Sequence, residues 1–208
     1  MNYERIPGRI YEQSFARIRA ETDLSRFPED GARVAERVVH ACGMVDVADE
    51  LQFTPGFAAT GRAALKSGVP IFCDGQMTAS GLMQRLLSEG SRIVAPENRS
   101  ELSLIARERG TTLSAVAVEC WAAELAGAIV AIGNAPTALF RLLELLDEGA
   151  DKPAVIFAFP VGFVGAAESK RELMRDSRGV DYLTLPGRRG GSAMAAAAVN
   201  ALLLEAAA

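Results

Sequence analysis

The sequence predicts an α/β fold: a single three-layer domain over residues 1–208, with a mostly parallel sheet and helices on both faces. Short apolar runs alternate along the chain with helical patterns of ten or more residues. Such alternation indicates parallel strands joined by helices, because a crossover between parallel strands needs a dozen or so residues. With 208 residues, of which 50% are hydrophobic and 23% charged, the chain is long enough to bury one sizeable core.

Helices are predicted first, over residues 10–22 and 31–41, where apolar side chains recur at helical spacing. Short apolar runs follow and stop at turn residues, as buried strands do. The five expected strands cover residues 69–74, 92–95, 128–134, 154–160 and 181–185. Further helices are expected over residues 112–126, 136–149 and about 192–206, the last of them rich in alanine.

The charge and hydropathy of the chain exclude some classes of protein. A net charge of -4 argues against a general nucleic-acid binder, which would have to neutralise many phosphates with Lys and Arg. No segment approaches the roughly 20 apolar residues that span a bilayer, and the first 15 residues lack the apolar run of a signal peptide. We therefore expect a cytoplasmic protein without nucleic-acid or membrane partners.

Cysteine and histidine, the usual ligands of structural metals, are sparse in this sequence. Cys42, Cys73 and Cys120 are widely spaced, and His40 is the single histidine. This spacing does not match a metal cluster, so we expect no metal and three buried, reduced thiols.

Glycine-rich or polar turns follow three of the predicted strands. They span residues 133–137, 160–165 and 187–192. The carboxyl ends of parallel strands gather at one edge, where ligands bind and helix N-termini present free N–H groups. Three such turns predict a site for an anionic ligand. In each turn alone, ordinary roles fit as well: Asn134 and Ser192 as N-caps, and Pro136 as a first-turn proline.

Individual side chains leave two interpretations open. His40 is the one residue whose ordinary titration range lies near neutrality, yet at a helix end it equally suits a structural role. Asp74 follows a predicted strand and could orient a ligand or cap the next helix. Arg188 and Arg189 could clamp carboxylates or be solvated. Glu168 and Lys170 are expected at the surface, and Trp121 is expected in the core.

Five longer strings carry a family resemblance. They are YEQSF at residues 11–15, VVHACG at 38–43, IGNAPTALF at 132–140, PVGFVGAAESK at 160–170 and GRRGGSAM at 187–194. Together they resemble the precorrin-8X methylmutases, also called precorrin isomerases, and the likeness runs nearly end to end. The HACG string is similar to the branch of the family in the oxygen-dependent cobalamin pathway.

The resemblance implies an isomerase without metal or organic cofactor. Its substrate would be precorrin-8X, whose ring C methyl group moves from carbon 11 to carbon 12 in a formal 1,5-sigmatropic shift. The product would be hydrogenobyrinic acid. The resemblance also implies a homodimer with active sites at or near the interface, and His40 as the general acid. Protonation of ring C or its nitrogen polarises the conjugated system and lowers the barrier to migration.

Substrate-binding residues also follow from the resemblance. The substrate carries several carboxylates while the chain is acidic overall, so binding must depend on local donors. The implied substrate contacts are Ser14, Arg17, Gly43, Asp74, Met77, Gly133, Asn134, Ala135, Thr137, Gly162, Phe163, Val164, Gly165, Arg188, Gly190, Gly191 and Ser192. Leu113 departs from the family pattern, since many relatives have an arginine at that position.

Two other functions remain as alternatives. A carrier could hold hydrogenobyrinic acid and hand it over to the next pathway enzyme with little catalysis of its own. A nucleotide-using enzyme could bind phosphates with the same turns. The second alternative lacks its motif, because Gly162-x-x-Gly165 is only a fragment of the dinucleotide fingerprint.

Overall fold

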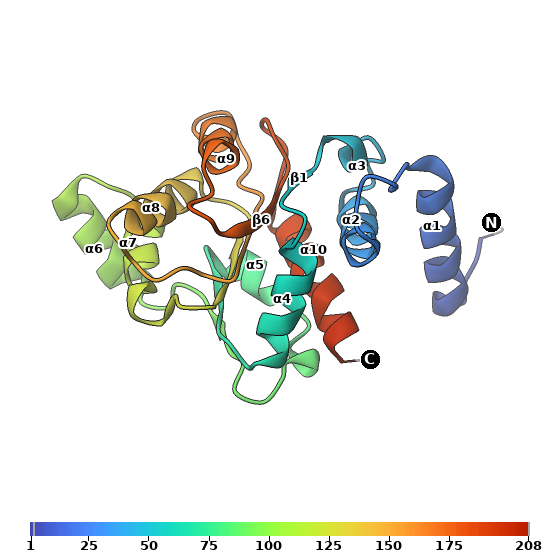
Figure 1. The fold of residues 1–208 in the computed structure, drawn as a ribbon, viewed down its shortest axis with the longest axis horizontal. Coiled ribbons are helices and arrows are strands. Elements are labelled where there is room, and N and C mark those ends of the chain that lie inside the picture. The colour runs from blue at the N-terminus through green and yellow to red at the C-terminus, as the bar shows by residue number, and fades with distance from the viewer. Residues whose placement is uncertain (2, 208) are drawn as a thin grey trace.

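A six-stranded sheet runs through the centre of the computed structural model, which describes residue 1 and residues 3–207 (Figure 1). The strand order is β1-β6-β5-β4-β2-β3, with β1 antiparallel to β6 and the other pairs parallel. The predicted α/β fold with a mostly parallel sheet is therefore confirmed. The strands are β1 (Gln52–Phe53), β2 (Ile71–Cys73), β3 (Ile93–Val94), β4 (Ile129–Ile132), β5 (Val155–Ala158) and β6 (Asp181–Thr184).

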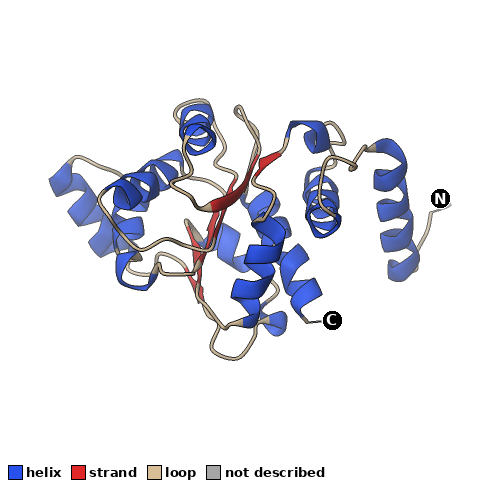
Figure 2. Ribbon diagram, viewed as in Figure 1, coloured by secondary structure: helices blue, strands red, loops and turns tan. Residues whose placement is uncertain are grey.

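Helices cover both faces of this sheet (Figure 2). One face is covered by α7 (Leu113–Glu119), α8 (Pro136–Asp147) and α9 (Ala166–Arg175), with α6 (Arg99–Arg109) packed outside α7. The other face is covered by α4 (Phe57–Lys66), α5 (Gln76–Ser80) and α10 (Ser192–Ala206). On that side α2 (Glu29–Cys42) packs on α10, and α1 (Pro7–Glu21) packs on α2. Short helices α3 (Val47–Glu50), η1 (Gln84–Leu86) and η2 (Ala122–Glu124) complete the described elements.

The central strands are apolar throughout because each contributes side chains to two cores. Successive side chains of a strand point to opposite faces. In β4, Ile129 and Ala131 join the core under α4 and α10, whereas Val130 and Ile132 join the core under α7 and α8. All four side chains are fully buried. A strand buried on both faces lacks polar alternation, which explains the continuous apolar runs in the sequence.

The helix expected over residues 112–126 is shorter in the structure. It ends at Glu119, because the N–H groups of Cys120 and Trp121 bond to carbonyls three residues back, which tightens the chain toward the 3-10 helix η2. Trp121 lies in the core, as predicted, with its ring stacked 5.3 Å from that of Phe72.

Several elements escaped prediction from the sequence, and β1, α4 and α6 show why. Strand β1 has two residues, too few to show a period. Helix α4 is rich in small residues, and α6 is polar with only one buried residue. None of the three presents the sustained apolar spacing from which helices and strands were inferred.

Gly190 lets the turn after β6 approach the end of β5. An added Cβ would lie 2.3 Å from the Phe159 carbonyl oxygen and 2.8 Å from that of Pro160. The next residue, Gly191, donates a 2.8 Å hydrogen bond from its N–H to the same Phe159 oxygen. Because the obstructing atoms are backbone, no side-chain rotation can make room.

We expect Gly190→Ala to lower the free energy of unfolding by about 2–3 kcal/mol, because overpacking forces the backbone apart. Equilibrium urea denaturation measures the difference. Gly8→Ala is the matched control: its Cβ would meet nothing within 4 Å, and alanine favours the helix in which it lies. If Gly190→Ala unfolds at the wild-type midpoint, the close approach does not constrain the turn.

Candidate active site

The turns after β4, β5 and β6 meet at the carboxyl edge of the sheet, as predicted. The N–H of Gly162 donates to the Arg188 carbonyl at 3.1 Å, and the N–H of Val161 donates to the Asn134 carbonyl at 3.4 Å. These bonds join the middle turn to each of its neighbours. Helices α8, α9 and α10 begin directly after the three turns, so their free N–H groups lie at the same edge.

Asp74, which follows β2, holds the turn after β4 from below. Its Oδ2 accepts hydrogen bonds from the N–H groups of Asn134 at 2.8 Å and Ala135 at 2.7 Å, and its Oδ1 accepts one from Gly133 at 3.0 Å. The Thr78 hydroxyl donates to Oδ1 at 3.1 Å. The side chain is only 5% exposed, so its polar contacts are within the protein. It also makes no capping bond to α5.

Ser192 lies beneath the same edge. Its hydroxyl is 3.1 Å from that of Thr78, and the residue is 8% exposed. The interpretation of Ser192 and Asn134 as N-caps is wrong, because Gly191 and Ala135 occupy those positions. Asn134 instead has its backbone held by Asp74 and is exposed.

Pro136 begins α8, as predicted. Thr137, the next residue, is half-buried and is one of the expected substrate contacts. Its hydroxyl lies 2.7 Å from that of Thr112, so the start of α8 is joined to the start of α7.

Large apolar side chains stand exposed above the turns. Phe163 is 85% exposed, Val164 is 89% exposed, and Met77 on α5 is 79% exposed. The Arg188 guanidinium lies 5.3 Å from the centre of the Phe163 ring. An exposed aromatic ring with a cation beside it suits an apolar ligand that carries acidic groups.

The two neighbouring arginines differ in their partners. Arg189 pairs with Asp46 at 2.5 Å and with Glu50 at 2.6 Å, and these carboxylates raise the pKa of its guanidinium. Arg188 is exposed and has no carboxylate within ion-pair distance in the described part of the chain. Of the two residues, Arg188 is the one free to bind an anion.

Lys170 on α9 contradicts its expected place on the surface. The residue is 0% exposed, and its Nζ donates a 2.6 Å hydrogen bond to the Arg189 carbonyl. Burial lowers the pKa of the ammonium to about 8. Glu168, one turn earlier, is exposed as predicted. The helical spacing of the sequence gave no sign that Lys170 faces inward.

His40 lies in the last turn of α2 and is exposed. Its ring stacks on Phe15 of α1, with 4.8 Å between centroids, and meets the edge of Tyr11 at 5.9 Å. Among residues 1 and 3–207, no side chain or carbonyl hydrogen-bonds its ring. The preceding Val38 and Val39 are buried and fix the helix, so the imidazole is held by stacking while its nitrogens remain open.

Arg37 is a candidate that the sequence did not single out. It lies one helical turn before His40, with its guanidinium 5.4 Å from the Phe15 ring centre and 5.7 Å from that of Tyr11. Within the described residues it forms no ion pair. The available signal was its spacing from His40, since residues three apart share a helix face.

The expected site residues fall into two groups within one chain. Ser14 and Arg17 lie on α1, which also contacts His40, whereas the remaining contacts lie around the turns. Gly43 lies between the groups: it ends α2 with φ of +69°, and the next residue, Met44, lines the cavity at the turns. A cavity of about 310 Å³ is lined there by Met44, Val161, Gly162, Phe163, Arg188, Arg189 and Gly190.

A second, larger cleft lies between α1, α2, α4 and α10. Its volume is about 630 Å³, and its lining includes Tyr11, Phe15 and Arg37, which surround or adjoin His40. The lining of this cleft also includes Glu12, Glu36 and Glu205, whereas the smaller cavity is lined by apolar residues and two arginines.

A profile of the precorrin-8X methylmutases matches residues 9–205. The chain belongs to the precorrin-8X methylmutase family. A precorrin-8X methylmutase of Pseudomonas aeruginosa is 57% identical over 205 residues, covering 99% of each chain. One from a Sinorhizobium species is 52% identical over 201 residues, covering 97% of this chain and 96% of the relative. The solved precorrin-8X methylmutase of Thermus thermophilus superposes with a TM-score of 0.83 at 34% identity, covering 95% of both chains.

Membership makes the chain an isomerase of cobalamin biosynthesis. Precorrin-8X methylmutases move a methyl group within a corrin precursor, which becomes hydrogenobyrinic acid. The resemblance found in the sequence motifs is confirmed by the profile and by relatives that match over nearly the whole chain.

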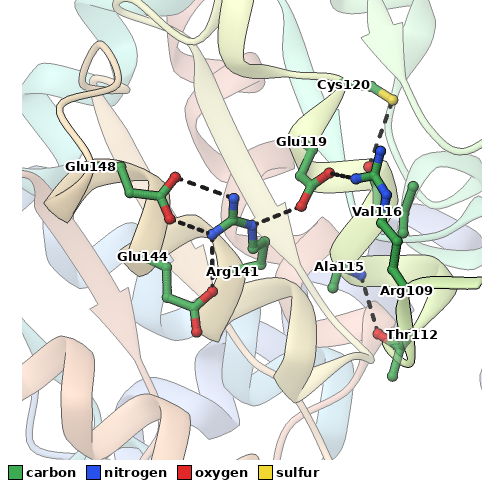
Figure 3. Close-up of polar contacts among 9 residues, drawn as sticks. All are labelled: Arg109, Thr112, Ala115, Val116, Glu119, Cys120, Arg141, Glu144 and Glu148. Atoms are coloured by element: carbon green, nitrogen blue, oxygen red, sulfur yellow. Dashed lines mark hydrogen bonds and ion pairs between the residues drawn. The ribbon is translucent and has the colours of Figure 1, made fainter. Parts of the chain in front are cut away.

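Leu113, the departure from the methylmutase pattern, begins α7 beside the candidate site. Thr112 caps this helix by accepting a 3.2 Å hydrogen bond from the Ala115 N–H (Figure 3). The aliphatic side chain of Leu113 is half-buried and offers no donor. An arginine at this position would add a cation near Thr137, and Leu113 supplies none.

An ion-pair network fixes the other end of α7 against α8. Arg141 donates from Nε to Glu119 at 3.0 Å and from a terminal nitrogen to Glu148 at 2.8 Å and Glu144 at 3.1 Å (Figure 3). Arg109, at the end of α6, pairs with Glu119 at 2.7 Å. A network of shared partners restrains side chains more than an isolated surface pair does. It orients α8, whose N-terminus belongs to the site.

The cysteines differ in exposure. Cys73 is buried, Cys42 is half-buried and Cys120 is exposed, so the prediction of three buried thiols is wrong for the last two. Cys120 is exposed because α7 ends there and the chain turns. All three are free, and the described residues hold no cluster of three metal-binding side chains. In the part of the chain that the structure describes, no helix is long and apolar enough to cross a bilayer.

Proposed function

We propose that His40 is the general acid of the methyl shift. The observation that carries this proposal is its environment: an exposed imidazole stacked on Phe15, with Arg37 free of carboxylate partners beside it. A group that protonates a large ligand must be reachable and must have an open nitrogen. Stacking restricts the ring without consuming either nitrogen, which suits a positioned acid.

The proton transfer balances over the reaction. His40 donates a proton to ring C or its nitrogen, which draws electron density from the conjugated system. The bond from the methyl carbon to carbon 11 then breaks as the bond to carbon 12 forms. Substrate and product are isomers, so the proton returns to His40 and no other reactant is required.

We propose that the substrate extends from His40 around the end of α2 to the three turns. The apolar ring system would cover Phe163, Val164 and Met77, which are otherwise exposed. Peripheral carboxylates would bind cationic side chains on both sides. The proposed cationic donors are Arg17, Arg37 and Arg188, and the proposed small contacts are Ser14, Gly43, Gly133, Asn134, Ala135, Thr137, Gly162, Gly165, Gly190 and Gly191.

Asp74 and Ser192 take a different role in this proposal from the substrate contact expected of them. Both side chains are almost fully buried and bonded to protein groups. We infer that they hold the turns in place, while the exposed side chains above them meet the substrate.

A homodimer is part of the proposal. The cavity at the turns is about 310 Å³, at the lower limit of pockets that enclose drug-sized ligands, and a tetrapyrrole is larger. His40 is also open to solvent. A second protomer over this face would enclose the ring and exclude water. Light scattering after size exclusion should give twice the 22.1 kDa chain mass, and a mass of one chain would contradict the dimer.

We further propose that residues 1–208 form one domain, and that the product is handed over to the next pathway enzyme. The first statement is supported by a family match that spans residues 9–205.

The decisive experiment is an absorbance time course with precorrin-8X, run on the wild type beside His40→Ala. Conversion by the wild type alone supports the proposed acid. Equal conversion by both proteins overturns it. Binding of the pigment by the wild type without turnover favours the carrier alternative.

We expect Arg37→Met to raise the KM for precorrin-8X by about 10- to 100-fold, since a hydrogen bond to a charged group contributes ~1.5–3 kcal/mol. The methionine keeps the packing over Phe15 but loses the cation. Steady-state kinetics measure the change, with Arg107→Met as control: Arg107 is an exposed arginine on α6, away from the site. An unchanged KM in Arg37→Met would remove Arg37 from the site.

A further inference from the structure

Lys170 is the one lysine that the structure buries completely among the described residues, and the reaction makes no direct use of it. The side chain is 0% exposed, and its Nζ lies 2.6 Å from the Arg189 carbonyl oxygen. No carboxylate lies within ion-pair distance in the described chain. A buried ammonium normally has a carboxylate partner, so this position is unusual.

The carbonyl that Lys170 binds belongs to the turn after β6. Two successive carbonyls of this turn are held from the neighbouring segment: Arg188 by the N–H of Gly162, and Arg189 by Lys170. Beyond it, Gly191 is tied to the Phe159 carbonyl. Lys170 therefore supplies the only side-chain bond to the turn's backbone in the described structure.

The turn after β6 carries two arginines whose side chains extend in different directions. Arg188 projects toward Phe163 and remains free for an anion, whereas Arg189 reaches across to Asp46 and Glu50 beyond the end of α2. The peptide unit held by Lys170 joins Arg189 to Gly190, and the unit before it, which joins the two arginines, is held at the Arg188 carbonyl by Gly162. Movement of the backbone at Arg189 would displace the free cation relative to the ring it accompanies.

We infer that Lys170 is a positioning residue for substrate binding, whose ammonium fixes the backbone at Arg189 and thereby the location of Arg188. The inference rests on the proposed placement of the substrate at the turns. Its energetic basis is that a buried, unpaired ammonium opposes folding, so an apolar residue of similar length would suit stability better. We explain the presence of Lys170, despite its cost in stability, by the position in which it holds the backbone at Arg189.

The test compares Lys170→Met with the wild type at pH 7. The methionine fills a similar volume but cannot donate to the Arg189 carbonyl. We expect KM for precorrin-8X and Kd for hydrogenobyrinic acid to rise about tenfold, equivalent to about 1.4 kcal/mol. We expect kcat to remain within about twofold, because Lys170 touches no reacting atom, and the urea midpoint to stay equal or rise.

Controls separate positioning from a general structural role. Lys152→Met removes the same charge from an exposed residue before β5 and should leave KM unchanged. Lys170→Gln, which keeps a donor without the charge, should give a KM between those of wild type and Lys170→Met. If Lys170→Met does not fold, Lys170→Gln alone provides the test: a raised KM supports the inference, and an unchanged KM overturns it.

The outcomes distinguish this inference from the proposed function. Wild-type KM in both Lys170 variants, with His40→Ala inactive, would overturn the inference and leave His40 as the acid. A lowered urea midpoint with reduced apparent kcat and unchanged KM would show that Lys170 only supports folding. Turnover by His40→Ala would instead overturn the proposed acid, whatever Lys170 does.

Discussion

Replacing His40 with alanine is expected to lower kcat by about 10²- to 10⁴-fold, the usual contribution of a positioned general acid. The loss should appear in kcat more than in affinity, because His40 acts when the transition state gains charge. Its ring contributes to binding only through a surface shared with Phe15 and Tyr11. We therefore expect the Kd of hydrogenobyrinic acid to stay within about threefold, roughly 0.7 kcal/mol.

His40→Gln is the matched control for shape. Glutamine fills part of the space over Phe15 and can form hydrogen bonds, but it does not donate a proton as an acid. It should therefore be as inactive as alanine. Recovery of most of the activity by glutamine would show that His40 only positions the substrate by hydrogen bonding.

Arg37→Met provides the complementary case. It should raise KM while a saturated enzyme turns over at a rate close to the wild type, since Arg37 is proposed to bind a peripheral carboxylate. If both variants changed kcat and KM alike, the aromatic surface formed by Phe15 and Tyr11 would have collapsed. A loss of kcat in His40→Ala and a raised KM in Arg37→Met would therefore separate the residue that acts in the reaction from the residue that binds the substrate.

The sheet could be predicted from the sequence because its strands are buried on both faces. Runs such as residues 128–134 and 154–160 must be apolar throughout to fill two cores at once, and such continuous apolar runs can be recognised in the sequence. The antiparallel edge strand β1 could not be predicted, because it has only two residues and its pairing with β6 is long-range. Local patterns reveal burial, whereas strand partners depend on the whole fold.

The meeting of the three turns could be predicted from the sequence, but the contacts of their side chains could not. Glycine-rich turns after parallel strands meet at one edge by topology alone. Which arginine of the adjacent pair remains free depends on Asp46 and Glu50, more than 130 residues away in the chain. The inward direction of Lys170 likewise depends on the turn that packs over α9. Neither contact leaves a periodic signal in the sequence.

Asp74→Asn is expected to produce the largest loss of stability among these variants. The carboxylate accepts hydrogen bonds from three successive backbone N–H groups, those of Gly133, Asn134 and Ala135. Asparagine replaces one acceptor oxygen with an NH₂ group, which then faces a donor. Unsatisfied buried donors cost ~1–3 kcal/mol each, so we expect the free energy of unfolding to fall by at least about 3 kcal/mol. Equilibrium urea denaturation measures this change.

Thr78→Val is the appropriate comparison, since it removes the fourth hydrogen bond to Asp74 and keeps the three from the backbone. It should cost only about 1 kcal/mol, the usual net value of one hydrogen bond. Folded Asp74→Asn should also bind hydrogenobyrinic acid more weakly, because the N–H groups after β4 lose their common anchor. If the two variants were equally stable and bound the product equally well, the close packing at Gly133 alone would hold this turn, since its Cβ would lie 2.5 Å from the Ser192 Cα. Asp74 would then contribute neither to the turn nor to the site.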